Sequence, residues 1–167
     1  GTVRINGELN VLLRGTGYLN VSNAGSELYA DDLYDSASDN WRTGGYFNVS
    51  DGGKIHVKGT SRLTYERGNI SGEGSQVNTQ TFFMGVCKSY GGDQFLSVNN
   101  KGEINASEKL SLGYYNQDSN TTLVVSDMGK ISAPEISLST NSELALGAQE
   151  GEKAKSAGVI DAKKIEF

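Results

Sequence analysis

The sequence predicts an all-β chain that folds as a parallel β-helix, a solenoid of short strands joined by tight turns. Three observations favour this fold: a recurring motif of apolar residues and a turn, 22 glycines alongside many asparagines and serines, and only one proline in 167 residues. Glycine, asparagine and serine oppose helix interiors, so the chain cannot be mostly helical. Proline lacks the N–H group that each interior rung needs for its neighbours, so its near-absence agrees with stacked strands.

The recurring motif reads apolar-x-Val-Ser/Asn-Asn/Asp-x-Gly-x-Ile-x-Ala/Val. Four stretches follow it, beginning with residues 19–25, 47–53, 96–102 and 123–129. Apolar-x-Val alternates with a period of two, which places both apolar side chains on one face of a strand. Asn/Asp-x-Gly predicts a corner, with glycine available for positive φ, and Ile-x-Ala predicts a second strand. In later units Leu110 and Leu112, Ile136 and Leu138, and Leu144 and Leu146 predict further short inward-facing strands.

One repeat is less regular than the others. The gap between Gly53 and Gly102 is nearly two repeat lengths, so we expect a divergent unit within 59–93, with Leu63 and Ile70 among its strand residues. We treat 31–46 and 59–93 as insertions whose loops project from the solenoid. With coils of roughly 20 to 28 residues, residues 1–167 would form one β-helix segment of about six to eight rungs.

A β-sandwich is the alternative architecture. It predicts self-contained hairpins with two-residue Asn-Gly or Asp-Gly turns, and in this sequence only Asp51-Gly52 fits that pattern. The solenoid is therefore favoured.

Charge and cysteine content narrow the classes of function. The net charge of -5 and the pI near 4.9 disfavour nucleic acid as a partner, because such binding needs a cationic face. The single cysteine, Cys87, cannot form an intrachain disulfide and is interpreted as a small buried apolar residue. There is no apolar stretch long enough to cross a membrane as a helix. The first and last residues fall within the pattern, so we expect a segment of a longer protein.

Residues 93–167 carry a resemblance to a known family. The stretch 123–133, the Leu-Ala-Leu-Gly-Ala sequence of 144–148 and the Gly-Val-Ile-Asp-Ala sequence that opens 158–167 resemble the passenger region of AIDA-type (type V) autotransporter adhesins of Gram-negative bacteria. The resemblance implies a right-handed β-helix, transport across the outer membrane by a separate C-terminal barrel, and a location at the bacterial surface or in the medium. These motifs are not specific for any one adhesin or ligand.

The most site-like segment is an acidic and aromatic cluster. It comprises Asp31, Asp32, Tyr34, Asp35 and Trp41, which we take as candidate ligand-binding residues. Glycosidic cleavage needs two carboxylates at a fixed separation, but these acids are bunched in one expected loop instead of recurring on successive coils. A solvated insertion loop with a partly buried Trp41 is the simpler interpretation.

Other chemistries have weaker support. Asp31, Asp32, Asp35 and Asp39 could offer oxygen ligands to calcium, but neither EF-hand spacing nor a calcium β-roll repeat is present, so we predict no metal site. His56 lies between Ile55 and Val57 and should point outward, without a nucleophile beside it. No catalytic residue and no cofactor are predicted.

The sequence therefore favours a non-enzymatic surface protein that takes part in adhesion or autoaggregation. Its partners would be host-surface glycans or proteins, or passengers on sister cells, without insertion of this segment into a membrane. Polar, uncharged outer side chains suit many weak contacts repeated along a length. Two alternatives stay open: a polysaccharide-active β-helix enzyme, and a structural stalk that binds nothing.

Overall fold

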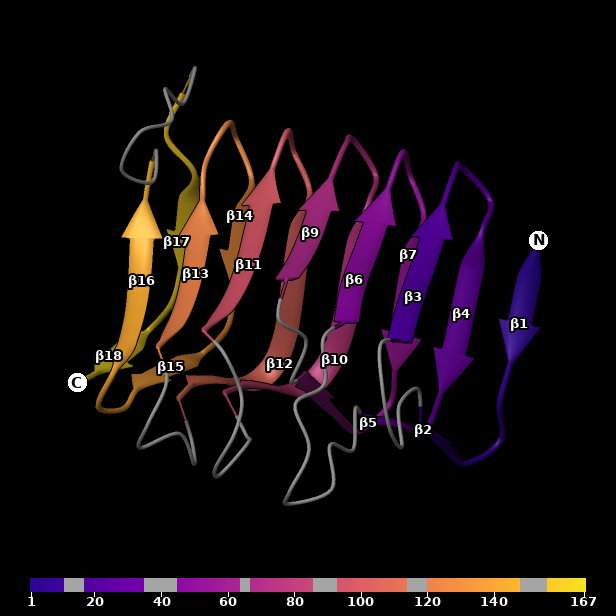
Figure 1. Ribbon diagram of the computed structural model, residues 1–167, viewed down its shortest axis with the longest axis horizontal. Coiled ribbons are helices and arrows are strands. Elements are labelled where there is room, and N and C mark those ends of the chain that lie inside the picture. The colour runs from indigo at the N-terminus through magenta and orange to yellow at the C-terminus, as the bar shows by residue number, and fades with distance from the viewer. Residues whose placement is uncertain (11–16, 35–44, 64–66, 86–92, 114–119, 148–155) are drawn as a thin grey trace.

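The protein is an all-β solenoid in which parallel strands stack along one axis (Figure 1). The computed structural model describes residues 1–10, 17–34, 45–63, 67–85, 93–113, 120–147 and 156–167. These residues form 18 strands and no helix, and none of them makes a helical segment suited to crossing a membrane.

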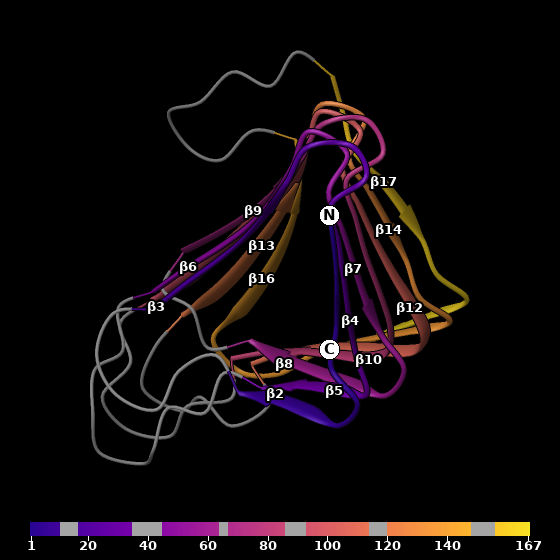
Figure 2. The ribbon, with the colours of Figure 1, turned by 90° about the vertical axis from the view of Figure 1, so that its right-hand side faces the viewer.

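Each coil of the solenoid has three strand segments, which form three flat faces around a roughly triangular cross-section (Figure 2), and in two coils one long strand supplies two of the segments. Seen from the N-terminal end, the chain runs down β4, across the bottom along β5 and up β6 while moving away from the viewer. That path is right-handed, as expected for parallel strands joined by crossovers. The parallel β-helix and its hand therefore agree with the sequence prediction.

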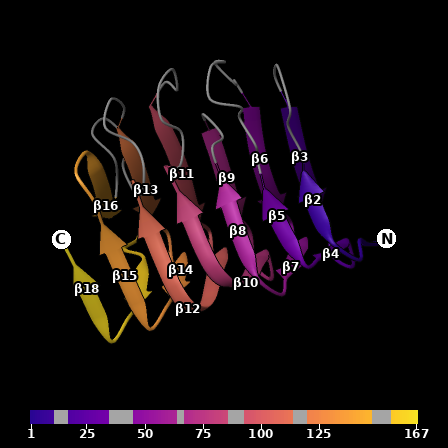
Figure 3. The ribbon, with the colours of Figure 1, turned by 90° about the horizontal axis from the view of Figure 1, so that it is seen from below.

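The strands are assigned to the faces by their pairing. The first face contains β1 (Thr2–Arg4), β4 (Glu27–Ala30), β7 (Lys54–Val57), the first part of β10 (Gln76–Met84), the first part of β12 (Glu103–Leu112), β14 (Lys130–Ser132) and β17 (Val159–Asp161). The second face, seen from below in Figure 3, contains β2 (Glu8–Asn10), β5 (Asp32–Tyr34), β8 (Thr60–Leu63), the later parts of β10 and β12, β15 (Glu135–Leu138) and β18 (Lys164–Glu166). The third face contains β3 (Gly17–Ser22), β6 (Gly45–Ser50), β9 (Arg67–Ser71), β11 (Gln94–Asn99), β13 (Thr121–Val125) and β16 (Ser142–Leu146).

The number of rungs agrees with the expected range. The third face is a 6-stranded sheet, and the first face follows a path of seven strands from β1 to β17. Between β3 and β16 the described chain makes about 5 turns, and further strands stack at both ends.

The core is a set of apolar columns that run parallel to the axis. In the third face Val21, Val49, Ile70, Val98 and Val125 are paired in register from coil to coil, and the last four are completely buried. The first face has a matching column: Ile55, Val77, Ile104 and Ile131, each completely buried. The apolar-x-Val and Ile-x-Ala alternation thus places both apolar residues of each motif in the core, as Leu96 and Val98 and then Ile104 and Ala106 show, and this was predicted.

The prediction of an insertion at 59–93 is wrong for most of its described residues. β8, β9 and β10 lie within this range and pair in register with strands on both sides. Leu63 and Ile70 are buried strand residues, as expected. The motif is hard to see because Gly68 occupies an inward position, where a Cβ would lie 2.6 Å from Leu96 Cδ1 and 3.7 Å from Phe47 Cβ. Neighbouring side chains fill the space that an apolar residue fills in other coils.

The insertion expected at 31–46 is also partly strand. Residues 32–34 form β5, which pairs with β2 and β8, and residues 45–46 begin β6. The intervening residues 35–44 lie outside the described part, as do 64–66 and 86–92 with Cys87. Of the further strands predicted, those at Leu110 and Ile136 belong to the second face, whereas Leu144 and Leu146 belong to the third face through β16.

The corners between the third face and the next coil come in two lengths. The shorter corners, residues 50–53, 99–102 and 126–129, end in a glycine whose Cβ would collide with the strand beneath, at 2.1–2.3 Å from a carbonyl oxygen. The longer corners, residues 22–26 and 71–75, end in serine and place Gly25 and Gly74 at a φ of 82°. The prediction that these glycines supply positive φ therefore holds for Gly25 but not for Gly53, Gly102 or Gly129, which are needed for close approach.

Candidate functional site

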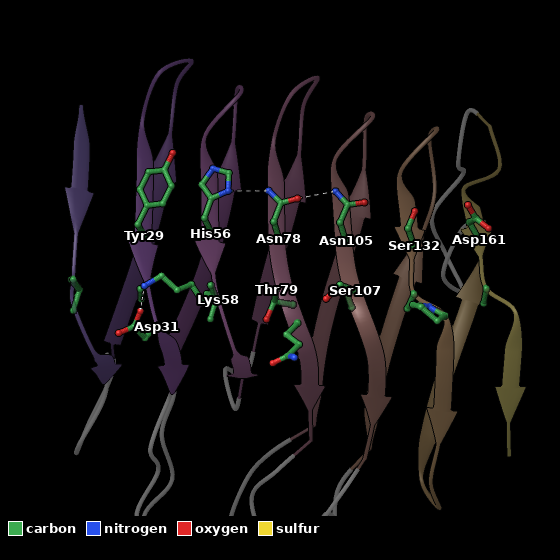
Figure 4. A pocket seen from close by; sticks show the side chains of 18 of the residues that line it. Tyr29, Asp31, His56, Lys58, Asn78, Thr79, Asn105, Ser107, Ser132 and Asp161 are labelled. Atoms are coloured by element: carbon green, nitrogen blue, oxygen red, sulfur yellow. Dashed lines mark hydrogen bonds and ion pairs between the residues drawn. The ribbon is translucent and has the colours of Figure 1, made fainter.

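A groove runs along the solenoid where the first face turns into the second, and it crosses every coil from β1 to β17 (Figure 4). Its volume is about 820 Å³. Coils are about 4.8 Å apart, so seven of them give the groove a length of roughly 29 Å.

Two columns of strand residues line the groove, together with a third column at the corner that consists of Asn6, Asp31, Lys58, Gln80, Ser107, Pro134 and Lys163. We call the outer column the groove ladder; it consists of Arg4, Tyr29, His56, Asn78, Asn105, Ser132 and Asp161, which are paired in register. We call the inner column the groove floor; it consists of Ala30, Val57, Thr79, Ala106, Ala133 and Ala162. Strand alternation explains both columns, since each ladder residue points outward and the next residue points inward.

The N-terminal half of the groove ladder is held together by its own contacts. The Arg4 guanidinium lies 4.0 Å from the centre of the Tyr29 ring, and that ring stacks on His56 at 4.6 Å. The Asn78 side-chain amide donates to His56 Nδ1 at 3.4 Å, and Asn105 Nδ2 donates to Asn78 Oδ1 at 3.1 Å. These contacts set the side-chain orientations visible in Figure 4.

Two ladder residues have shifted pKa values. The Tyr29 hydroxyl donates to Glu27 Oε2 at 2.7 Å, and this hydrogen bond raises the pKa of Tyr29. Partial burial lowers the pKa of His56, with Lys54 and Arg4 adding to the effect and Glu27 opposing it. A neutral His56 also suits the hydrogen bond that its Nδ1 accepts from Asn78, because a protonated ring has no acceptor.

We expect His56 to titrate below its ordinary pKa of 6.5. As the pH falls below that value, the unfolded chain takes up this proton before the folded chain does, so the free energy of unfolding decreases until the folded pKa is passed. An NMR titration of the His56 ring signals measures the midpoint. Denaturation of the parent and His56→Gln over pH 5 to 8 should show that the variant lacks this part of the pH dependence. A midpoint at or above 6.5 would contradict the assignment.

The sequence-predicted cluster does not form one site. Asp31 lines the groove and pairs with Lys58 at 2.5 Å, whereas Asp32 Oδ1 accepts the Thr60 backbone N–H at 2.7 Å and joins two coils. Tyr34 lies on the second face, with the Arg62 guanidinium 5.2 Å from its ring centre. Asp35 and Trp41 lie outside the described residues.

The carboxylates of the groove are too far apart to act as a pair on one glycosidic bond. Among the described lining residues only Asp31 and Asp161 are acidic. They belong to β-strand levels five coil spacings apart, roughly 24 Å, whereas glycosidases hold two carboxyl groups about 5 to 9.5 Å apart. The described residues also contain no cluster of three or more His, Cys, Asp or Glu side chains that could hold a metal ion.

Sequence reasoning missed the central ladder residues Asn78, Asn105 and Ser132. Each stands immediately before an inward Thr or Ala, and this is the signal that could have found them. The signal was hidden because Asn78 lies in the divergent repeat. His56, in contrast, points outward as predicted and lines the groove.

The third face carries a second row of polar side chains. An amide ladder connects Asn20, Asn48, Asn69 and Asn99 through hydrogen bonds of 2.8, 3.4 and 3.1 Å. Beside it the exposed rings of Tyr18 and Tyr46 stack at 5.5 Å. The amide groups in this row form hydrogen bonds with one another across neighbouring coils, so the row stabilises the stacking of coils.

The groove and the third-face amide ladder both follow the solenoid axis. No protein-family model, no curated protein and no solved structure matches this chain.

Proposed function

We propose that this chain is an adhesive, non-enzymatic segment of a bacterial surface protein, exported by an autotransporter pathway, and that it attaches through the groove. The observation that carries the proposal is the continuity of the groove across the coils of a stiff solenoid. The export route and the surface location are proposed from the resemblance of residues 93–167 to adhesin passengers.

The groove favours many weak contacts over one strong contact. Its central coils offer amide and hydroxyl groups, and every coil repeats the same geometry one spacing further on. A partner that extends along the axis can therefore make several small contacts at once, and its affinity grows with the number of coils it covers. Host-surface glycans or proteins and passengers on sister cells are the proposed partners.

The separation of the groove carboxylates favours adhesion over polysaccharide cleavage. Asp31 is already paired with Lys58, and Asp161 lies on β17 at the far end. A structural stalk that binds nothing is the alternative, because a spacer would need the same solenoid but would not use the groove. Blocking the groove separates these two alternatives.

Ser132→Trp should block the groove, because Ser132 is half-buried in its central part. In cells that display the full parent protein, we expect this variant to reduce attachment about tenfold at equal surface display. Thr122→Trp is the matched control, since Thr122 is a half-buried outward residue on the third face. Attachment and settling should be scored for both variants.

Each outcome has a definite meaning. Unchanged attachment of Ser132→Trp cells would refute the groove as the adhesive surface and favour a spacer. Loss of attachment in Thr122→Trp cells alone would place adhesion on the third face instead.

A further inference from the structure

We infer that the groove binds an uncharged polysaccharide in extended form, laid parallel to the solenoid axis with successive sugar units facing successive coils. This inference deepens the proposed function and rests on the groove being its binding surface.

Charge in the groove argues against an anionic or cationic polymer. The charged lining residues of the described part lie near its two ends: Arg4, Asp31 and Lys58 toward the N-terminus, and Asp161 and Lys163 on the last coil. Arg4 covers the Tyr29 ring and Asp31 pairs with Lys58, so three of the five already have partners. The lining of the coils between them is uncharged. A sulfated or carboxylated chain would need a row of cations where the groove offers amides and hydroxyls.

In the same central coils, some side-chain hydrogen-bonding groups have no partner among the described residues. Asn105 Nδ2 donates to Asn78 Oδ1 and to Glu103 Oε2, but the Oδ1 of Asn105 has no partner among the described residues. The hydroxyls of Ser107 and Ser132 likewise have no hydrogen-bond partner there and line the groove. Sugar hydroxyls both donate and accept, so they can pair with an amide oxygen and with serine hydroxyls without introducing charge.

Spacing favours a sugar chain over a peptide. The ladder and the floor repeat once per coil, every 4.8 Å or so, which is close to the length of a pyranose unit in an extended chain. An extended peptide advances about 3.3 Å per residue and alternates its side chains, so it would fall out of register along the axis. The N–H and C=O groups of a bound peptide would also need hydrogen-bond partners. The backbone groups of the solenoid strands cannot serve, because they already pair with the strands of neighbouring coils.

The central coils offer little apolar surface for stacking on a sugar ring. The side chains of Thr79, Ala106 and Ala133 are buried, and Pro134 is the exposed apolar ring beside them. Both faces of the Tyr29 ring are occupied, one by Arg4 and the other by His56, so this ring offers no open stacking platform. We therefore expect weak binding per sugar, with affinity built up by length.

The test uses the 167-residue chain, an array of neutral oligosaccharides of two to eight units, and heparin oligosaccharides as the anionic comparison. We expect a neutral series whose affinity increases with length and changes little with salt, and which shifts the NMR signals of Asn105 and Ser132. Asn105→Ala and Ser132→Ala should each weaken binding about fivefold, the effect of one lost hydrogen bond to an uncharged partner. Thr122→Val, which removes a hydroxyl from the third face, should leave binding unchanged.

Failure of this inference and failure of the proposed function are distinguishable. If Ser132→Trp abolishes attachment but no neutral oligosaccharide binds, the ligand class is wrong and the adhesive groove stands. Salt-sensitive binding of heparin alone would also overturn the inference. If a neutral series binds in the groove and attachment of Ser132→Trp cells is unchanged, the ligand class holds but the groove is not the adhesive surface.

Discussion

Gly102→Ala is expected to lower the free energy of unfolding by about 3 kcal/mol or more, the upper end of the range for overpacking. A Cβ at this position would lie 2.3 Å from Ile70 O and 2.7 Å from Ile70 C, which are backbone atoms of the coil beneath. The corner cannot move away freely, because Gly102 N donates to Asn99 O at 2.8 Å and Gly102 O accepts from Lys130 N at 2.9 Å. Relief would therefore require breaking contacts to a neighbouring coil.

Ser26→Ala is the matched control. Ser26 closes one of the longer corners, and no described third-face strand lies beneath it, since β3 is the first strand of that face. We expect a change within about 0.5 kcal/mol. Urea unfolding followed by circular dichroism measures both variants. Equal unfolding midpoints for Gly102→Ala and the parent would show that the corner relaxes and that close approach does not explain the glycine.

Phe82→Ala should destabilise the chain by about 4 kcal/mol, whereas Phe83→Ala on the same strand should cost about 1 kcal/mol or less. Phe82 is completely buried and stacks in register on Leu110. Phe83 points outward from the second face, where its ring centre lies 5.6 Å from the Arg62 guanidinium. The two variants lose the same atoms, so the difference isolates burial in the solenoid core.

The measurement is again the urea midpoint, with the slope of the transition compared between variants. A solenoid unfolds through nearest-neighbour interfaces, so a change of slope would signal loss of cooperativity between coils rather than a uniform shift. Similar midpoints for Phe82→Ala and Phe83→Ala would contradict the assigned facing of β10 and its register with β12.

Most of the fold could be predicted because its signals are local. Alternation of inward and outward residues is set within each strand, and Val49, Val98 and Val125 are buried where the motif placed them. The repeat also predicted stacking, because coils with one pattern can share one core column. The unit containing Gly68 could not be recognised from the motif, because a glycine stands at an inward position where the other units have an apolar residue. Only the structure shows that the Leu96 side chain fills this space.

The candidate site could be predicted only in part. His56 was expected to face outward and does so in the groove ladder. Asp31 and Asp32 looked like one cluster because they are adjacent in the chain. The corner between the first and second faces passes between them, so one lines the groove and the other accepts a backbone N–H of β8.

The sequence by itself determined the fold class, the direction in which each regular strand residue faces and the approximate number of rungs. Only the tertiary structure decided which residues stand side by side across coils, and with them the groove. The physical reason is that the register depends on the length of every corner, and corners of two lengths alternate irregularly along the chain. Asn78, Asn105 and Ser132 become neighbours only once the coils between them have been closed.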